Sequence, residues 1–127
     1  MDLHRSILLV DDEARTCRCL AQLLRNDGFD VEFAGDGAAA IARLAHQLPD
    51  FLVTDYAIPH ANGIVVSMFA RSRNPNLPIV FLTAFPEPCR AALLNPPAIV
   101  LTKPLVYDDL LRILGPAAQT PHTRRAA

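Results

Sequence analysis

Four short apolar runs, each followed by a polar residue, constrain the fold of this chain more than any other feature. They span residues 7–10 before Asp11 and Asp12, 51–54 before Asp55, 79–82 before Thr83, and 98–102 before Lys103. Apolar runs of this length are typical of strands that are buried on both faces of a parallel sheet. Because such strands end along one edge, where open α/β proteins bind their ligands, we expect these polar residues to share a single crevice.

The residue types at this predicted crevice indicate its chemistry. Three neighbouring carboxylates repel one another, so such a cluster is tolerated mainly when a hard divalent cation lies among them. Mg²⁺ prefers oxygen ligands of this kind. A lysine and a threonine opposite the cation are what a bound phosphoryl group needs. The pattern therefore favours a site that handles Mg²⁺ and phosphoryl groups.

Length and composition narrow the class of protein. The 127 residues suffice for one domain with a real core, and 51% of them are hydrophobic. The apolar runs are too short to span a membrane, and no signal sequence opens the chain. A net charge of −1 provides no electrostatic basis for binding nucleic acid directly. We therefore expect a cytoplasmic protein that contacts neither membranes nor nucleic acids.

The three cysteines predict neither a metal site nor a redox pair. Cys17 and Cys19 are two positions apart on a predicted helix and therefore point to different faces, and Cys89 is remote in sequence. We expect all three to be reduced thiols, as is usual in the cytosol.

Strand-like and helix-like segments alternate five times along the chain, which predicts an α/β fold with a doubly wound parallel sheet and helices on both faces. The predicted strands are 6–10, 30–34, 51–54, 78–83 and 98–101, and the predicted helices are 14–27, 37–47, about ten residues after Gly63, 87–94 and 106–114. Strand 30–34 alternates apolar and acidic residues, so we expect a half-exposed edge strand. Pro96 and Pro97 limit the fourth helix to about two turns.

The apolar residues of each predicted helix indicate which side faces the sheet. We expect Leu20, Leu23 and Leu24 of the first helix to be buried together. For the third helix we expect the same of Val65, Met68 and Phe69. Asp36 is suited to cap the second helix, and residues 117–127, which have no hydrophobic period, predict a flexible C-terminal tail.

Five motifs in this order resemble the receiver domain of bacterial two-component response regulators. They are Asp11-Asp12, Asp55, the stretch 55–63, Thr83-Ala84 and Lys103-Pro104, and the resemblance extends over residues 6 to about 115. It implies a flavodoxin-like fold with five strands in the order 2-1-3-4-5 and one receiver domain at residues 1–116.

The resemblance also implies roles for the acidic residues. Asp55 would accept a phosphoryl group from a histidine kinase or phosphotransfer protein and become an aspartyl phosphate. Asp12 and Asp55 would bind Mg²⁺ directly, Asp11 would bind it through water, and the backbone carbonyl of Ala57 would complete the protein ligands. A carboxylate attacks an anionic phosphoryl donor only when a cation neutralises the transferring oxygens, so the metal has a chemical reason to be there.

Further residues would hold the phosphoryl group itself. By the same resemblance Lys103 would pair with its oxygens, Thr83 would donate its hydroxyl proton, and the backbone amides of Ala57 and Ala84 would add hydrogen bonds. The family pattern also implies a cis peptide bond between Lys103 and Pro104.

Two departures from the family pattern concern the output of the domain. Receivers usually carry a tyrosine or phenylalanine three residues before the lysine, and this chain has Val100 there. A valine has no ring to rotate between exposed and buried positions. Together with the Pro96-Pro97 pair, this leads to the hypothesis that signalling uses the loop after Thr83 or the short fourth helix.

The residues fit other functions less well. Each acid alone could be a helix cap, which would leave Thr83 and Lys103 unexplained. Phosphohydrolases resembling the haloacid dehalogenase family need an acid two residues after the nucleophile, where this chain has Ala57, so we expect no enzyme. A constitutive interaction module is disfavoured because the whole residue set is present. We expect a stand-alone regulator with an unknown protein partner, a phosphoryl shuttle or sink, or a piece of a longer chain.

Overall fold

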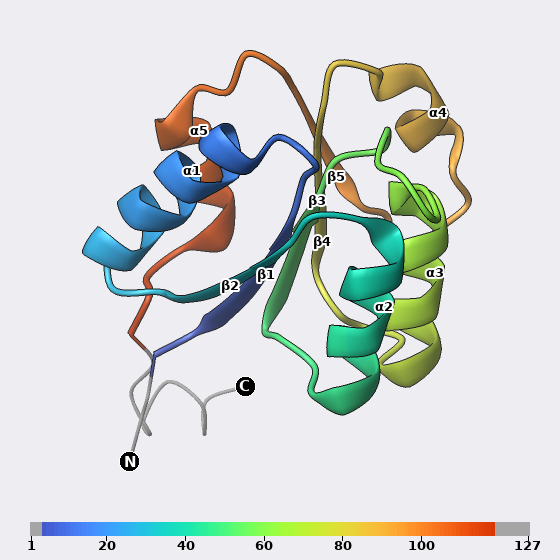
Figure 1. Cartoon of the computed structure of the whole chain (residues 1–127), viewed down its shortest axis with the longest axis horizontal. Coiled ribbons are helices and arrows are strands. Elements are labelled where there is room, and N and C mark those ends of the chain that lie inside the picture. The colour runs from blue at the N-terminus through green and yellow to red at the C-terminus, as the bar shows by residue number, and fades with distance from the viewer. Residues whose placement is uncertain (1–3, 119–127) are drawn as a thin grey trace.

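The computed structural model describes residues 4–118 and has a five-stranded parallel sheet between two layers of helices (Figure 1). The strand order is β2-β1-β3-β4-β5, which confirms the predicted doubly wound topology. The strands are β1 (Ser6–Val10), β2 (Asp30–Ala34), β3 (Phe51–Thr54), β4 (Ile79–Thr83) and β5 (Ile99–Thr102). The helices are α1 (Ala14–Asn26), α2 (Gly37–His46), α3 (Gly63–Arg73), α4 (Pro86–Ala91) and α5 (Tyr107–Leu114).

Two cores, one on each face of the sheet, hold these layers together. Helices α1 and α5 cover one face, and α2, α3 and α4 cover the other (Figure 1). In the central strands, alternate residues supply the two cores, so that Leu9 and Val53 face α1 while Leu8 and Phe81 face α2 and α3. All of β3 and β4 is buried, which is why both segments appear in the sequence as uninterrupted apolar runs. Among residues 4–118, no helix is both long enough and apolar enough to cross a membrane.

The predicted edge strand and the predicted short helix are both present. Strand β2 lies at one edge of the sheet with Val31 buried, although Phe33 is 39% exposed. Helix α4 spans six residues and begins with Pro86. The side chain of Asp36 caps α2 by accepting a hydrogen bond from the amide of Ala39 at 2.7 Å, as predicted.

The predicted inner faces of α1 and α3 are partly wrong. Leu23 is 47% exposed, whereas Leu20 and Leu24 are buried as expected. Val65 and Met68 of α3 are exposed, and only Phe69 of the predicted set packs partly against the core.

The residues that α3 does bury are mostly small, and they are Gly63, Val66, Ser67 and Ala70. Because apolar residues occur all around this helix, hydrophobic periodicity alone could not select the buried side. The Ser67 hydroxyl donates to the Gly63 carbonyl at 2.7 Å, so this polar side chain is satisfied although it is fully buried.

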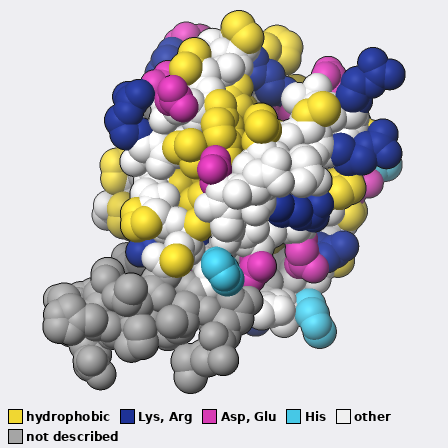
Figure 2. Space-filling model, turned by 90° about the vertical axis from the view of Figure 1, so that its left-hand side faces the viewer, with side chains coloured by type: hydrophobic (Ala, Val, Ile, Leu, Met, Phe, Trp, Pro, Cys, Tyr) yellow, Lys and Arg dark blue, Asp and Glu magenta, His cyan; other side chains and the backbone are white. Residues whose placement is uncertain are grey.

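Exposed apolar side chains also occur on the side of the molecule that carries α1 and α5. They are interspersed there with acidic and basic side chains (Figure 2). At the end of the described chain, Ala117 is buried in the core and Ala118 pairs with His4. The first two residues of the predicted tail are therefore packed against the domain, and its remainder, 119–127, lies outside the described residues.

The loop between β3 and α3 packs tightly against the start of α2. The amide of Gly37 donates to the carbonyl of Pro59 at 2.9 Å. A Cβ atom on Gly37 would lie 2.1 Å from the carbonyl oxygen of Ala61. His60 and Ala61 have φ angles of 57° and 97°, a region that L-residues rarely adopt. The loop that follows Asp55 is thus held in an unfavourable backbone conformation by its contact with α2.

We expect Gly37→Ala to destabilise the domain by about 2 kcal/mol, because the new methyl group would collide with backbone that cannot easily move. Gly35→Ala is the matched control, since a Cβ there meets nothing within 4 Å. Urea denaturation of both variants measures the difference. Equal stability of the two variants would contradict a tight contact between α2 and the loop.

Candidate functional site

Backbone hydrogen bonds place the predicted site residues at the carboxyl edge of the sheet. The amide of Asp55 donates to the carbonyl of Val10 at 3.0 Å, and the amide of Lys103 donates to the carbonyl of Thr83 at 2.9 Å. These bonds continue the β-ladder by one residue beyond the end of each strand. The site residues therefore begin from rigid sheet positions, although they lie outside the apolar runs.

An ion-pair network of Lys103, Asp11 and Asp55 forms the centre of the site. The Lys103 Nζ atom lies 2.9 Å from Asp11 Oδ2 and 3.0 Å from Asp55 Oδ2. Asp11 and Asp55 are 7% and 8% exposed, so this ammonium neutralises two carboxylates that are largely withdrawn from water. Lys103 is the only lysine in the chain.

The environment of Lys103 keeps its side chain charged. Burial by itself lowers the pKa of the ammonium, but the hydrogen bonds and charges of Asp11 and Asp55 outweigh this effect. The pKa of Lys103 is therefore raised above its usual value. A positive charge is thus available at neutral pH beside the Asp55 carboxylate.

The remaining carboxylate oxygens are oriented by backbone amides. Asp55 Oδ1 accepts a hydrogen bond from the amide of Tyr56 at 2.6 Å and a longer one from that of Ala57 at 3.4 Å. Asp11 Oδ1 accepts from the amide of Glu13 at 3.0 Å, just before α1 begins. Each acid therefore uses one oxygen for Lys103 and the other for the backbone. The link from Asp11 to Glu13 was not predicted, although an acid three residues before a helix is a usable signal for it.

Thr83 joins the site to the loop that leads into α4. The residue is fully buried, and its hydroxyl oxygen accepts a hydrogen bond from the amide of Phe85 at 3.0 Å. As an acceptor in this bond, the hydroxyl keeps its own proton for donation. Ala57 and Ala84, whose amides were predicted to contact a phosphoryl group, are both exposed.

The predicted cluster of three carboxylates is only partly assembled. Asp11 and Asp55 meet through Lys103, whereas Asp12 is exposed and outside this network. Among residues 4–118, no three or more histidine, cysteine, aspartate or glutamate side chains are grouped closely enough to hold a metal ion.

The donor chemistry of the site still fits Mg²⁺. All the candidate ligands, the side chains of Asp11, Asp12 and Asp55 and the carbonyl of Ala57, are oxygen atoms, which this hard cation prefers. Asp12 is exposed and follows Asp11 directly in the chain, beyond the end of β1. The predicted ligand roles remain predictions.

Two of the cysteines lie near the site without reactive character. Burial raises the pKa of the Cys17 thiol to about 11, with a further contribution from the charge of Asp11. Burial raises that of Cys89 to about 11 as well, and here the charge of Asp55 contributes. Both cysteines are free thiols and are therefore protonated near neutral pH.

Comparisons with known proteins agree with this geometry. A family model described as the response regulator receiver domain matches residues 7–114. The probable transcriptional regulatory protein TcrX of Mycobacterium tuberculosis is 40% identical over 79 residues, which cover 62% of this chain and 34% of that protein. The chain spans about a third of the length of the curated relatives it matches.

Solved structures show the same fold. A response regulator receiver protein from Sinorhizobium medicae is 32% identical with a TM-score of 0.79, and the match covers 85% of this chain and 89% of that one. The response regulator TrrA from Thermotoga maritima, solved in complex with Mg²⁺ and BeF, is 25% identical with a TM-score of 0.77. That match covers 87% of this chain and 96% of the other.

We expect Lys103→Met to destabilise the domain at neutral pH by about 3 kcal/mol, because it leaves two buried carboxylates without a cation. The raised pKa of Lys103 determines the alkaline behaviour. The ion-pair contribution is complete below the pKa of an unfolded lysine, about 10.4, and is lost as the pH rises through the higher folded value. The difference in stability between wild type and variant should therefore shrink above that pH.

Urea denaturation across the pH range measures this difference. Lys103→Arg keeps a cation and should lose less stability at neutral pH. A Lys103→Met variant as stable as wild type at neutral pH would contradict the role assigned to the ion pairs.

Proposed function

Because the chain belongs to the response regulator receiver family, we propose that Asp55 accepts a phosphoryl group from a histidine kinase or phosphotransfer protein in a Mg²⁺-dependent reaction. The observation that carries this proposal is the double ion pair of Lys103 with Asp11 and Asp55. It puts a nucleophilic carboxylate and an ammonium that is charged at neutral pH side by side at the edge of the sheet. The complex of TrrA with Mg²⁺ and BeF supports the metal by analogy.

In the proposed reaction a carboxylate oxygen of Asp55 attacks phosphorus, and the bond from phosphorus to the donor nitrogen breaks. The imidazole nitrogen of the donor keeps the electron pair. Bound Mg²⁺ would neutralise the phosphoryl oxygens, held by Asp12, Asp55, the Ala57 carbonyl and, through water, Asp11. Lys103, which already contacts Asp55, is close enough to pair with a phosphoryl oxygen once that group is attached.

The remaining contacts of the phosphoryl group come from neutral groups. The amide of Ala57 already points toward Asp55 Oδ1, and Ala57 and Ala84 are small and exposed, which leaves room for the group. Thr83 would donate its hydroxyl proton while it continues to accept from Phe85. We propose no turnover of small phosphate esters, since Ala57 occupies the place of the general acid that such hydrolases use.

For the output we propose contacts with another protein, or a role as phosphoryl shuttle or sink. The chain carries a net charge of −1, which does not favour direct binding to nucleic acid. The matched segment makes up only about a third of the relatives named as transcriptional or DNA-binding regulators. The proposal places the exchange in the cytoplasm.

Incubation with acetyl phosphate and Mg²⁺ should add the mass of one phosphoryl group to the intact protein, and Asp55→Asn should abolish this gain. Asp50→Asn is the matched control, because Asp50 lies just before the opposite end of β3 and hydrogen-bonds to Ser6 there. Intact-protein mass spectrometry measures the gain. A gain that survives in Asp55→Asn, or that occurs equally in EDTA, would overturn the proposed acceptor or its metal dependence.

The hydrogen bond from Phe85 to Thr83 provides a route from the site to α4. Phe85 is 56% exposed and immediately precedes α4, so a shift of the Thr83 hydroxyl would move an exposed ring and the start of a short helix. Val100 is half-buried and pairs with Phe81 in the sheet, where it has no comparable freedom. We therefore propose that this loop carries the readout of the phosphorylated state.

With beryllofluoride and Mg²⁺, we expect the backbone amide signals of Lys103 and Phe85 both to shift in the NMR spectrum of the wild type. Lysine-selective ¹⁵N labelling isolates the Lys103 signal, because the chain contains no other lysine. Thr83→Ala should keep the Lys103 shift and lose most of the Phe85 shift, whereas Thr83→Ser should keep both. An unmoved Phe85 signal in the wild type would exclude this readout without affecting the proposed acceptor.

A further inference from the structure

Strand β2 presents part of its backbone to the outside of the sheet. It pairs with β1 alone and therefore lies at the edge. The amide of Asp30 donates to the Arg5 carbonyl, and the carbonyl of Ala34 accepts from the Asp11 amide, so these even-numbered residues bond toward β1. In a parallel ladder the alternate residues bond the other way. The amides and carbonyls of Val31 and Phe33 thus point outward, where another strand could pair with them.

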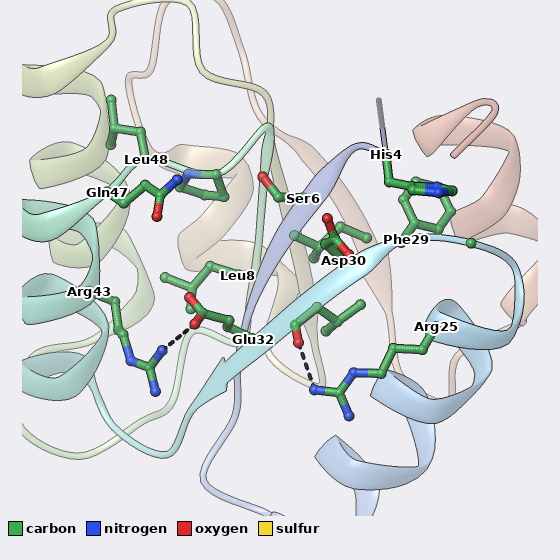
Figure 3. Close-up of a pocket in the computed structure, with 14 residues that line it drawn as sticks. His4, Ser6, Leu8, Arg25, Phe29, Asp30, Glu32, Arg43, Gln47 and Leu48 are labelled. Carbon is green, nitrogen blue, oxygen red and sulfur yellow. Dashed lines mark hydrogen bonds and ion pairs between the residues drawn. The ribbon is translucent and has the colours of Figure 1, made fainter. Parts of the chain in front are cut away.

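Two arginines flank this edge, one from each helical layer. A hollow on the surface surrounds β2, and Figure 3 shows that the strand runs through its middle. Arg25 of α1 lies on one side of the strand, and Arg43 of α2 lies on the other (Figure 3).

The two arginines make different contacts. Arg25 Nη2 donates to the outward carbonyl of Val31 at 2.6 Å, which occupies one of the groups that a new strand would need. Arg43 Nη1 lies 2.8 Å from Glu32 Oε2, and both of these side chains are largely exposed. Arg25 therefore covers the backbone of the edge, whereas Arg43 only partly neutralises the acid beside it.

A second copy of this chain is the partner that the edge fits. If two β2 strands pair antiparallel about Glu32, Val31 of each copy lies opposite Phe33 of the other. Residues that face each other in this way exchange both backbone hydrogen bonds and form an apolar pair on the α1 side of the sheet. Half of the new hydrogen bonds would end on a Val31 carbonyl, which Arg25 already occupies.

The same register brings like charges together. Glu32 of one copy would lie directly opposite Glu32 of the other, which is unfavourable across an antiparallel pair. We propose that Arg25 and Glu32 together prevent β2 from pairing with the β2 strand of a second copy, and so keep the two sheets of separate molecules from joining. The β2 edge is thus a surface through which two copies could pair, and the side chains of Arg25 and Glu32 block that pairing.

The test removes both side chains in Arg25→Ala/Glu32→Gln, which leaves the net charge unchanged. We expect its mass in sedimentation equilibrium to rise from 13.9 kDa toward twice that value as concentration increases, while wild type stays at 13.9 kDa. The matched control is Arg90→Ala/Glu87→Gln, which removes another exposed arginine and glutamate, paired at 3.3 Å on α4. The control should remain monomeric.

Substituting proline for Phe33, whose amide points outward, tests whether β2 is the surface through which the double variant associates. Phe33→Pro removes an outward donor without removing a bond to β1, so adding it to the double variant should restore the monomer. Phe33→Lys, which puts a charge at the same edge, serves if the proline variant does not fold. A folded double variant that stays monomeric, or whose association survives both substitutions at Phe33, would overturn the proposal.

Hydrogen exchange supplies a second measurement. In the associated double variant, the amides of Val31 and Phe33 should exchange more slowly than in wild type, with little change in β5 at the opposite edge. If the double variant is unfolded, Arg25→Gln/Glu32→Gln retains more of the arginine's apolar stem and is measured in its place. Protection confined to β5, or wild type already dimeric through β2, would contradict the proposal.

Discussion

The site depends on one ammonium that lies between two buried carboxylates. Asp11 and Asp55 come from the ends of neighbouring strands and are almost fully withdrawn from water, so together they would repel. Lys103 reaches both from the far edge of the sheet and balances them. Because Lys103 already contacts Asp55, any cation or phosphoryl group that binds beside Asp55 must change the contacts of Lys103.

Around this centre, the backbone does most of the positioning. The β-ladder continues by one residue into the loops after β1, β3 and β5, and amides orient the free oxygens of both acids. The loop after Asp55 is held against α2 by a glycine that admits no side chain, and the loop after Thr83 is tied to its hydroxyl. The proposed phosphoryl site therefore lies where the rigid sheet joins these two loops.

The sequence predicted the sheet well because buried parallel strands leave an uninterrupted apolar signal. It was less reliable wherever a helix carries apolar residues on several sides. Leu23, Val65 and Met68 were expected inside and are exposed, since α3 instead buries small residues that allow close packing. The sequence also did not show that Lys103 pairs with Asp11 and Asp55 while Asp12 is exposed, because that depends on how the strand ends are arranged in space.

By itself, the sequence determined the order of elements, the family and the set of polar residues at the strand ends, because these follow from local patterns and short motifs. The tertiary structure alone decided which acids meet, which helix faces are buried and how the β2 edge is covered. Each of these depends on contacts between residues far apart in the chain, such as Lys103 with Asp11, and no local pattern encodes the distance between them.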